Sequence, residues 1–374
     1  MAEKLLMKGN DAVAVAAMRC GCDGYFGYPI TPQSEILETL TEADPQSDTG
    51  MVVLQAESEV AAINMIYGGA ACGKKVFTSS SGPGISLMSE GLSYLAGAEL
   101  PCLIVNVMRG GPGLGTIQPG QADYFQSTKG GGHGDYNLIV LAPDSVQEMY
   151  DFVDLGFELA FKYRNPVLIL TDGIIGQMME KVELGPVKPR LTDEEIIQKY
   201  GSWATTGKPA NRERNIVTSL DLDANRQERF NLKLQRKYDE IRANEVRCEK
   251  ISCDDAEYVI IAYGLSARVG KKTVESARNK GIKVGILRPI TLFPYPYDEI
   301  KKMSPRLKGI LTVEMSAGQM LEDVRSAVEG KVPVHFYGRL GGMLPEPEDV
   351  LAALEDLVAN EIGRTELPGL RRSY

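Results

Sequence analysis

The sequence predicts an α/β protein in which two units are each built on a mostly parallel sheet. Short apolar runs alternate with helix-like segments from about residue 25 to residue 171, a pattern that is typical of right-handed β-α-β crossovers. Loops rich in glycine and proline follow several of these runs, and in a parallel sheet such loops gather at one edge. The alternation stops near residue 183 and begins again at residue 257, which indicates a second unit.

The first unit is expected to span residues 1–185. It opens on Gly9, Asn10 and Asp11, which offer an N-terminal cap to an Ala- and Val-rich helix that glycines end near residue 21. Further helices are expected where apolar residues recur at helical spacing, and strands where a short apolar run ends in a loop. The expected strands cover residues 25–27, 51–55, 75–78, 102–107, 138–141 and 167–171, and the expected helices cover residues 33–40, 57–71, 85–95 and 145–161.

Residues 186–254 are expected to form a linker and an arm, because prolines interrupt the pattern and a polar, helix-favouring stretch follows over residues 224–249. A smaller α/β unit is expected over residues 255–360, and a tail rich in Arg, Gly and Pro over residues 361–374. In the smaller unit, strands are expected at residues 257–264, 283–287, 309–313 and 332–336, and helices at residues 266–278 and near residues 319 and 347.

The composition excludes several classes of protein. With 374 residues, 43% hydrophobic and 24% charged, the chain has the composition of a globular protein of two domains. Its net charge of −9 argues against nucleic acid and anionic membranes as partners. No apolar run approaches the roughly 20 residues of a membrane span, and the N-terminus lacks a signal-peptide core, so a cytoplasmic location is expected.

Metal chemistry is not expected in this chain. Its six cysteines are scattered without a Cys-x-x-Cys pair, so an iron–sulfur cluster of its own is not predicted. The only histidines are His133 and His335, which are too few for a histidine-rich metal site.

The most constrained loop is Gly-Tyr-Pro-Ile-Thr-Pro at residues 27–32. Pro29 and Pro32 each lack a backbone N–H and bias the preceding residue toward an extended conformation, so the loop is rigid. Thr31 places a hydroxyl between the two prolines. A stiff loop on a scaffold is where binding groups tend to lie.

Two charged residues follow strands in the same way. Glu59 lies in the first turn of a helix, whose dipole favours a carboxylate, and it is either a functional acid or a helix-terminal charge. Glu57 competes for the functional role, but two residues apart on a helix the pair cannot face the same way. Arg109 ends a strand and precedes glycines, so it either grips an acidic substrate or forms a structural salt bridge.

The remaining glycine-rich turns are ambiguous. Residues 79–84 and 264–267 are strand-to-helix turns without a complete phosphate-binding motif. They leave open a different class of function, a non-catalytic nucleotide-binding α/β protein. His133, in a glycine-rich loop, is either a substrate-side donor or a surface residue.

Several ordered motifs together resemble the α subunit of 2-oxoacid:ferredoxin oxidoreductases. These are the proline loop, the stretch over residues 55–62, Arg-Gly-Gly-Pro-Gly-Leu-Gly at 109–115, Asp-Tyr-Phe-Gln at 123–126, and Gly-Asp-Tyr at 134–136. The resemblance continues through Gly-Lys-Pro at 207–209 and Arg-Pro-Ile-Thr-Leu-Phe-Pro at 288–294, so it covers nearly the whole chain.

The resemblance implies a thiamine-diphosphate pyrimidine-binding domain followed by a C-terminal domain like that of transketolase. Glu59 matches the family glutamate that hydrogen-bonds the cofactor aminopyrimidine. Thr31 and Arg109 match residues that hold the substrate carboxylate, and Tyr28, Pro29 and Ile30 match the loop that lines the cofactor.

The resemblance also implies partners. The Gly-Asp-Gly…Asn motif that holds Mg²⁺ and diphosphate is absent, and residues 170–173 match it only in part. The diphosphate-binding domain, Mg²⁺ and the [4Fe-4S] clusters are therefore expected in a β subunit and in γ and ferredoxin-like subunits, with ferredoxin as electron acceptor. Coenzyme A is the expected co-substrate.

Within the family, residues 113–119 and the following glycine–histidine run are most similar to the branch that acts on 3-methyl-2-oxobutanoate (2-oxoisovalerate). The 2-oxoglutarate-type α subunit is the alternative, but it usually has a Ser-Thr-Gly run after the Gly-Gly-Pro. A transketolase-like or acyl-transferring thiamine enzyme that does not use ferredoxin is a further alternative.

Overall fold

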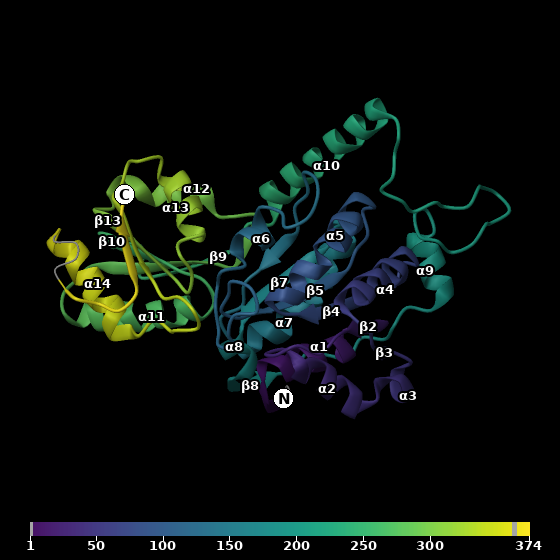
Figure 1. Ribbon diagram of the computed structural model, residues 1–374, viewed down its shortest axis with the longest axis horizontal. Coiled ribbons are helices and arrows are strands. Elements are labelled where there is room, and N and C mark those ends of the chain that lie inside the picture. The colour runs from purple at the N-terminus through teal and green to yellow at the C-terminus, as the bar shows by residue number, and fades with distance from the viewer. Residues whose placement is uncertain (1–2, 361–364) are drawn as a thin grey trace.

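The computed structural model describes residues 3–360 and 365–374, and it contains two large sheets, each with its own helices (Figure 1). The seven-stranded sheet lies on the right of Figure 1 and the six-stranded sheet on the left. Both sheets are mostly parallel, so the predicted fold class is confirmed.

The seven-stranded sheet has the order β12-β6-β7-β5-β4-β2-β3. All its pairings are parallel except that of β12 with β6. The central strand β5 is buried along its whole length, as expected for a parallel sheet with helices on both faces. The strands are β2 (Gly24–Gly27), β3 (Val52–Gln55), β4 (Val76–Ser80), β5 (Leu103–Met108), β6 (Ile139–Leu141), β7 (Val167–Asp172) and β12 (Thr291–Phe293).

Helices follow these strands along the chain. Helix α1 packs against α7 and α2, and α4 packs against α5. The apolar side chains of these helices and of the sheet form one continuous core. The helices are α1 (Gly9–Arg19), α2 (Ser34–Ala43), α3 (Pro45–Thr49), α4 (Glu59–Ala71), α5 (Gly82–Gly97), α6 (Tyr124–Thr128), α7 (Val146–Tyr163) and α8 (Gly173–Gln177).

The six-stranded sheet has the order β15-β14-β13-β10-β11-β9, with antiparallel strands only at its two edges. Its strands are β9 (Cys248–Ile251), β10 (Tyr258–Ile261), β11 (Val284–Pro289), β13 (Gly309–Glu314), β14 (Val334–Gly338) and β15 (Leu370–Ser373). Its helices are α11 (Gly264–Asn279), α12 (Tyr297–Met303), α13 (Met320–Val328) and α14 (Pro347–Ala359), with a 3₁₀ turn at Ser304–Arg306.

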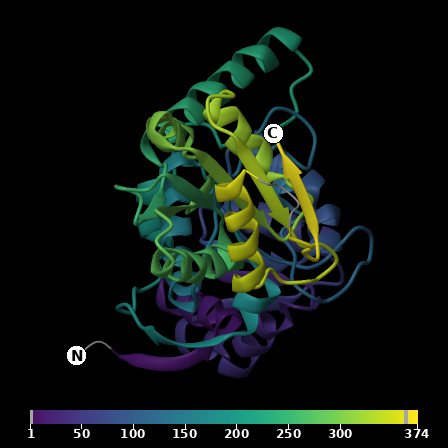
Figure 2. The ribbon, with the colours of Figure 1, turned by 90° about the vertical axis from the view of Figure 1, so that its left-hand side faces the viewer.

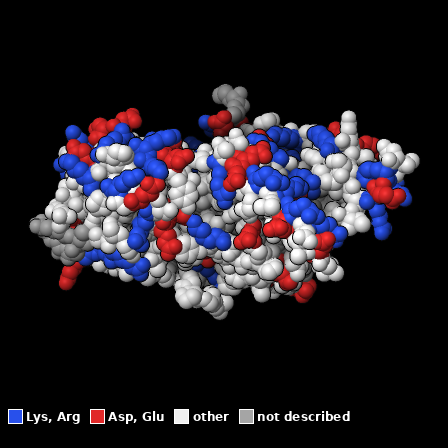
Figure 3. All heavy atoms as spheres, turned by 90° about the horizontal axis from the view of Figure 1, so that it is seen from above, with Lys and Arg blue, Asp and Glu red and all other residues white. Residues whose placement is uncertain are grey.

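Between the two sheets in sequence lie α9 (Asp193–Tyr200) and the long polar helix α10 (Ala224–Asn244), which projects at the top of Figure 1. Charged side chains of both signs are interspersed over the face seen from that side (Figure 3). Among the described residues, no helix is both long enough and apolar enough to span a membrane.

Five strands depart from the sequence prediction, and β12 is one of them. Strand β1 (Lys4–Lys8) pairs antiparallel with β8 (Met179–Glu183), and neither was expected. Strand β9 lies within the expected arm but joins the second sheet. Of the expected tail, residues 361–364 lie outside the described residues. The last part of the tail forms β15, which pairs antiparallel with β14 (Figure 2). Each of these strands lies at the edge of a sheet, where backbone hydrogen bonds hold it on one side only. Their sequences show little apolar patterning.

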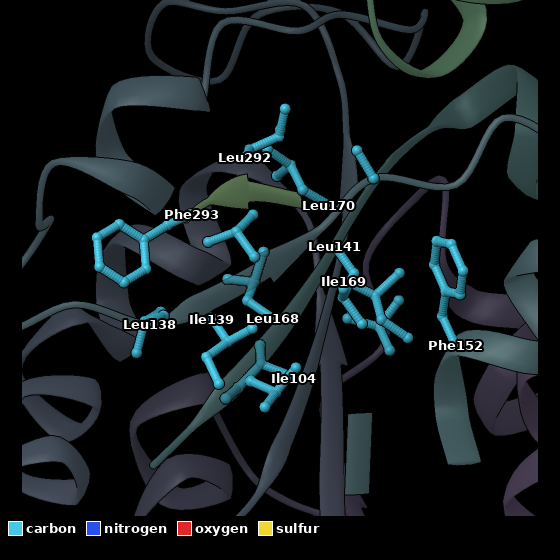
Figure 4. Packing of buried hydrophobic residues seen from close by; sticks show 14 of the residues in the cluster. Ile104, Leu138, Ile139, Leu141, Phe152, Leu168, Ile169, Leu170, Leu292 and Phe293 are labelled. Carbon is cyan, nitrogen blue, oxygen red and sulfur yellow. The ribbon is translucent and has the colours of Figure 1, made fainter. Parts of the chain in front are cut away.

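The short strand β12 crosses from the second half of the chain into the first sheet. It pairs antiparallel with β6, and Figure 4 shows Phe293 on the side of Leu138 and Ile139, and Leu292 next to Leu170. The apolar core of the first sheet therefore includes residues from both halves of the sequence.

A buried arginine joins the two sheets electrostatically. Arg288 on β11 is 2% exposed, and its guanidinium donates to both carboxylate oxygens of Glu148 on α7, at 2.6 and 2.7 Å. It also lies 2.5 Å from Asp144 Oδ1. A planar guanidinium matched to a carboxylate in this way is a strong, geometrically specific contact.

Replacing Arg288 by methionine is expected to destabilise the chain by about 3–5 kcal/mol, because the carboxylate of Glu148 would stay partly buried without its cationic partner. Arg226→Met is the matched control, since Arg226 is 60% exposed and pairs with Asp221 at the surface. That loss should cost less than about 1 kcal/mol. Urea unfolding of both variants measures the difference, and equal midpoints would contradict the importance of the buried pair.

Candidate active site

The candidate site lies where four neighbouring parallel strands end. The proline loop follows β2, the Glu59 helix follows β3, a glycine turn follows β4 and Arg109 follows β5. Because β3, β2, β4 and β5 are adjacent in the sheet, their loops meet at its carboxyl edge.

Arg109 and Thr31 are in contact through the guanidinium of Arg109 and the backbone of Thr31. Arg109 is 7% exposed, and its Nη1 donates to the backbone oxygen of Thr31 at 3.0 Å. Its Nη2 donates to the backbone oxygen of Leu114 at 2.9 Å, and its Nε is buried without a partner among the described residues. No carboxylate neutralises Arg109 by a direct ion pair within the described part of the chain, so the structure does not support the alternative of a structural salt bridge.

The proline loop is held from beneath by residues that the sequence prediction did not identify. Gln33 is fully buried; its Nε2 donates to the backbone oxygen of Tyr28 at 3.0 Å and its Oε1 accepts from Ser79 at 2.6 Å. Asn10 donates to the backbone oxygen of Pro32 at 2.8 Å. Tyr28, Pro29 and Thr31 themselves remain exposed, and Ile30 is partly buried. Buried hydrogen bonds therefore fix the backbone of the loop, while most of its own side chains remain exposed.

Glu59 is a buried carboxylate that has no hydrogen-bond or salt-bridge partner among the described residues. It is 6% exposed at the first position of α4, whose N-terminal cap is Ser58, with Ser58 Oγ accepting from Ala61 N at 3.2 Å. None of the side-chain hydrogen bonds between described residues uses the Glu59 carboxylate. Glu57 is exposed, so of these two acids Glu59 is the one that lies inside the site.

Gly84, in the first turn of α5, keeps the Glu59 carboxylate accessible. A Cβ on Gly84 would lie 2.6 Å from Glu59 Oε1 and 2.1 Å from Ser80 Oγ. Both distances are shorter than any normal contact, so the carboxylate needs a glycine at this position.

Gly84→Ala is expected to destabilise the chain by about 1–3 kcal/mol through overpacking. Gly68→Ala is the control, because Gly68 is an exposed helical glycine on α4 with nothing within 4 Å of an added Cβ. The control should be neutral or stabilising by up to about 1 kcal/mol. Thermal unfolding compares the two, and a Gly84→Ala variant as stable as the control would contradict the packing described here.

Both halves of the chain line a cavity of about 1010 Å³ beside Arg109. The sequence prediction missed the contribution of the second half, which comes from loops after β13 and β14. The lining residues are Gly82, Pro83, Ser86, Leu87, Arg109, Gly110, Gly111, Pro112, Gly113, Gly120, Ala122, Asp123, Gln126, Met315, Ser316, Ala317, Gln319, Leu340 and Gly341.

One buried glutamine fixes the second half against this cavity. Gln121 is fully buried; its Nε2 donates to Tyr263 O at 2.9 Å, and its Oε1 accepts from Met315 N at 2.9 Å and Ser266 Oγ at 2.8 Å. Its backbone N–H donates to Met315 O at 2.8 Å. Every polar group of this side chain is bonded across the boundary between the two sheets, so the cavity wall is held in place.

Asp123 is the carboxylate in the cavity wall. Its Oδ2 accepts from Asn106 Nδ2 at 3.0 Å. Burial raises the pKa of Asp123 above its ordinary value, and the hydrogen bond from Asn106 and the charge of Arg109 only partly offset this. The sequence motif contained Asp123, but spacing alone did not indicate that it would face Arg109.

Comparison with known proteins agrees with this arrangement. The family described as pyruvate flavodoxin/ferredoxin oxidoreductase, thiamine diphosphate-binding, matches residues 15–240, and the pyruvate:ferredoxin oxidoreductase core domain II matches residues 256–350. The ketoisovalerate oxidoreductase subunit VorB of Methanothermobacter thermautotrophicus is 52% identical over 95% of this chain and 98% of its own. The 2-oxoglutarate synthase subunit KorA of Archaeoglobus fulgidus is 36% identical over 92% of this chain and 97% of its own.

Among solved structures, the 2-oxoglutarate:ferredoxin oxidoreductase from Magnetococcus marinus superposes with a TM-score of 0.82 and 27% identity over 96% of this chain and 66% of that chain. A split-gene transketolase shares the fold, with a TM-score of 0.58 at 13% identity. The predicted family and branch are confirmed. The subunit naming differs, because the similar ketoisovalerate oxidoreductase subunit is named VorB, whereas an α subunit was predicted. The chain belongs to the pyruvate flavodoxin/ferredoxin oxidoreductase family.

Proposed function

We propose that the chain is the pyrimidine-binding subunit of a thiamine-diphosphate-dependent 2-oxoacid:ferredoxin oxidoreductase. The reaction is the oxidative decarboxylation of 3-methyl-2-oxobutanoate to its acyl-coenzyme A, with ferredoxin as electron acceptor. The observation that carries the proposal is the buried carboxylate of Glu59, to which no described residue of the chain donates a side-chain hydrogen bond.

Glu59 fits the cofactor's aminopyrimidine. Its carboxylate accepts no side-chain hydrogen bond among the described residues, lies in the first turn of α4 at the positive end of the helix dipole, and is left uncovered by Gly84. Tyr28 and Pro29, which follow the neighbouring strand β2, are exposed and offer apolar surface at the same edge of the sheet. Thiamine diphosphate would supply a nucleophilic carbon that attacks the 2-oxo carbon and permits loss of carbon dioxide. Glu59 would hold the aminopyrimidine in the tautomer that activates that carbon.

Arg109 and Thr31 would hold the carboxylate of the oxoacid. Arg109 has a buried, unpartnered Nε and is fixed by two backbone carbonyls, so its charge is available without reorganisation. Thr31 itself is exposed, so its hydroxyl is proposed to contact the same carboxylate. A positioned guanidinium orients a carboxylate better than a mobile lysine does.

The cavity beside Arg109 favours a substrate with an apolar side chain. Its wall contains Pro83, Leu87, Pro112, Met315 and Leu340, and among its described lining residues Arg109 is the one cation. A second carboxylate, as in 2-oxoglutarate, would have no cation to pair with in this part of the site. This supports the branched oxoacid over the 2-oxoglutarate alternative.

The other half of the site is proposed to come from partner subunits. Asp172, in the partial diphosphate motif, instead caps α8 by accepting from Ile174 N at 2.9 Å and Ile175 N at 3.2 Å. Around the site, Val60, Leu87, Leu114 and Ile117 are each at least 48% exposed, which suits a surface that another subunit covers. We therefore assign the diphosphate site and Mg²⁺ to a β subunit, and the [4Fe-4S] clusters to partner subunits that include γ and ferredoxin-like chains.

The nucleotide-binding alternative has less support. The turn at Gly264 is filled, because a Cβ there would lie 3.1 Å from Gln121 Nε2 and the amide of Leu265 donates to Asp172 Oδ2 at 3.4 Å. A phosphate would have to displace these buried contacts. A thermal-shift screen against nucleotides tests this alternative directly.

The proposal is tested by binding calorimetry with thiamine diphosphate and Mg²⁺ on this chain alone and on the complex purified with its natural partners. Binding is expected only in the complex, because this chain holds only the pyrimidine half of the site. Tight binding by the isolated chain, or none by the intact complex, would contradict the division of the site.

A further inference from the structure

The cavity beside Arg109 contains a carboxylate to which the proposed function assigns no role. Asp123 immediately precedes α6 and lines the same cavity as Arg109. Asn106, fully buried on β5, donates its Nδ2 to Asp123 Oδ2 at 3.0 Å. The other oxygen, Oδ1, has no donor among the described residues and is not sealed from the cavity.

The acyl acceptor must reach this same cavity if the proposed function is right. In a 2-oxoacid the carbonyl carbon is bonded directly to the carboxylate carbon, so a carboxylate held by Arg109 leaves the reacting carbon next to it. A thiol that attacks that carbon has to approach within roughly 3–3.5 Å of it. The thiol therefore comes into the space that Arg109 and Asp123 line.

A thiol is a poor nucleophile until its proton is removed. Among the described residues that line the cavity, Asp123 is the one that can accept a proton near neutral pH, because the others are apolar, amide, hydroxyl or guanidinium groups. Glu59 is committed to the aminopyrimidine in the proposed function. The nearby Tyr263 is fully buried, and its hydroxyl donates to the backbone oxygen of Gln121 at 3.1 Å.

We propose that Asp123 is the general base that accepts the thiol proton of coenzyme A during acyl transfer. In this step the S–H bond breaks and its proton passes to Asp123 Oδ1. The sulfur forms a bond to the acyl carbon, and the bond that joins the acyl carbon to the cofactor breaks. The two electrons of the oxidation leave through the iron–sulfur clusters of the partner subunits, as in the proposed function on which this inference rests.

The surroundings of Asp123 suit a base. Its burial raises its pKa, which brings it closer to neutrality than a surface aspartate. Asn106 fixes the orientation of the carboxylate through one oxygen and leaves the other for the thiol. The charged and titratable groups that act on it are Arg109, at the end of β5, and Tyr263, at the end of β10.

The test uses Asp123→Asn in the assembled enzyme and compares two steps in single-turnover experiments with 3-methyl-2-oxobutanoate. One step is release of carbon dioxide before coenzyme A is added, and the other is acyl-coenzyme A formation after it is added. The ratio of the second rate to the first is expected to fall about 100-fold or more. Asp123→Glu should recover part of the ratio, and Asp135→Asn, an exposed carboxylate nearby, should leave it unchanged.

Two further readouts separate chemistry from structure. The acyl-transfer rate of the unaltered enzyme should rise with pH as Asp123 loses its proton and then level off, whereas Asp123→Asn should lack this rise. The affinity for coenzyme A, measured by calorimetry, should change less than about threefold, well below the loss in rate.

An unchanged ratio would overturn the assignment. Equal loss in both steps, or loss explained by weak binding of coenzyme A, would make Asp123 a structural residue and also overturn it. If the unaltered enzyme releases no carbon dioxide from any oxoacid, the proposed function fails and the inference fails with it, which distinguishes the two failures.

Discussion

Replacing Glu59 by glutamine in the assembled enzyme is expected to lower turnover by about 10²- to 10⁴-fold. Glutamine has nearly the same shape but does not carry the charge that favours the reactive tautomer of the aminopyrimidine. The carboxylate lies buried at the start of α4, and its removal breaks no hydrogen bond or ion pair within the described part of the chain. The loss should therefore appear in catalysis and not in folding or assembly.

Glu57→Gln is the matched control for this variant. Glu57 is two residues away, carries the same charge and is exposed. Turnover of the assembled complexes is measured together with their elution on size exclusion. Near-normal activity of Glu59→Gln, or equal losses in both variants, would refute the role of Glu59.

Replacing Arg109 by methionine is expected to lower kcat/KM for the oxoacid by about 10- to 100-fold, the typical worth of hydrogen bonds to a charged group. The guanidinium is almost fully buried and keeps an unpartnered Nε. Affinity for thiamine diphosphate should change far less, because Glu59 and the proline loop hold that ligand in the proposed site.

Arg109 also donates to the backbone oxygens of Thr31 and Leu114, so methionine removes structural contacts as well. Arg109→Lys separates the two effects, because it keeps the charge and loses the fork of donors. The lysine variant should show an intermediate KM for the oxoacid. Steady-state kinetics that are unchanged in both variants would contradict substrate binding by Arg109.

The sequence was sufficient to place the central part of the fold. Continuous apolar runs such as Leu103–Met108 have no polar face, so they predict strands that are covered on both sides. The edge strands β1, β8, β9 and β15 carry no such pattern. They depend on backbone pairing with a partner far away in the sequence, which local periodicity does not reveal.

The sequence likewise predicted part of the candidate site but not the residues that support it. Glu59, Arg109 and Thr31 follow strands, and sheet topology alone brings their loops to one edge. Gln33, Gln121 and Asp123 were not assigned roles, because their importance comes from contacts across distant segments. Gln121, for example, bonds to Met315 and Tyr263, which lie in the second half of the chain.

The most direct test of the account is anaerobic purification of this chain with its natural partners and an assay of coenzyme-A-dependent reduction of a viologen dye. The substrates are 3-methyl-2-oxobutanoate, 2-oxoglutarate and pyruvate, compared in parallel by kcat/KM. Activity with a clear preference for the branched oxoacid is expected, since the described cavity offers one cation and an apolar wall. Preference for 2-oxoglutarate would contradict the assigned branch, and no reduction by an intact, cluster-loaded complex would contradict the proposed function itself.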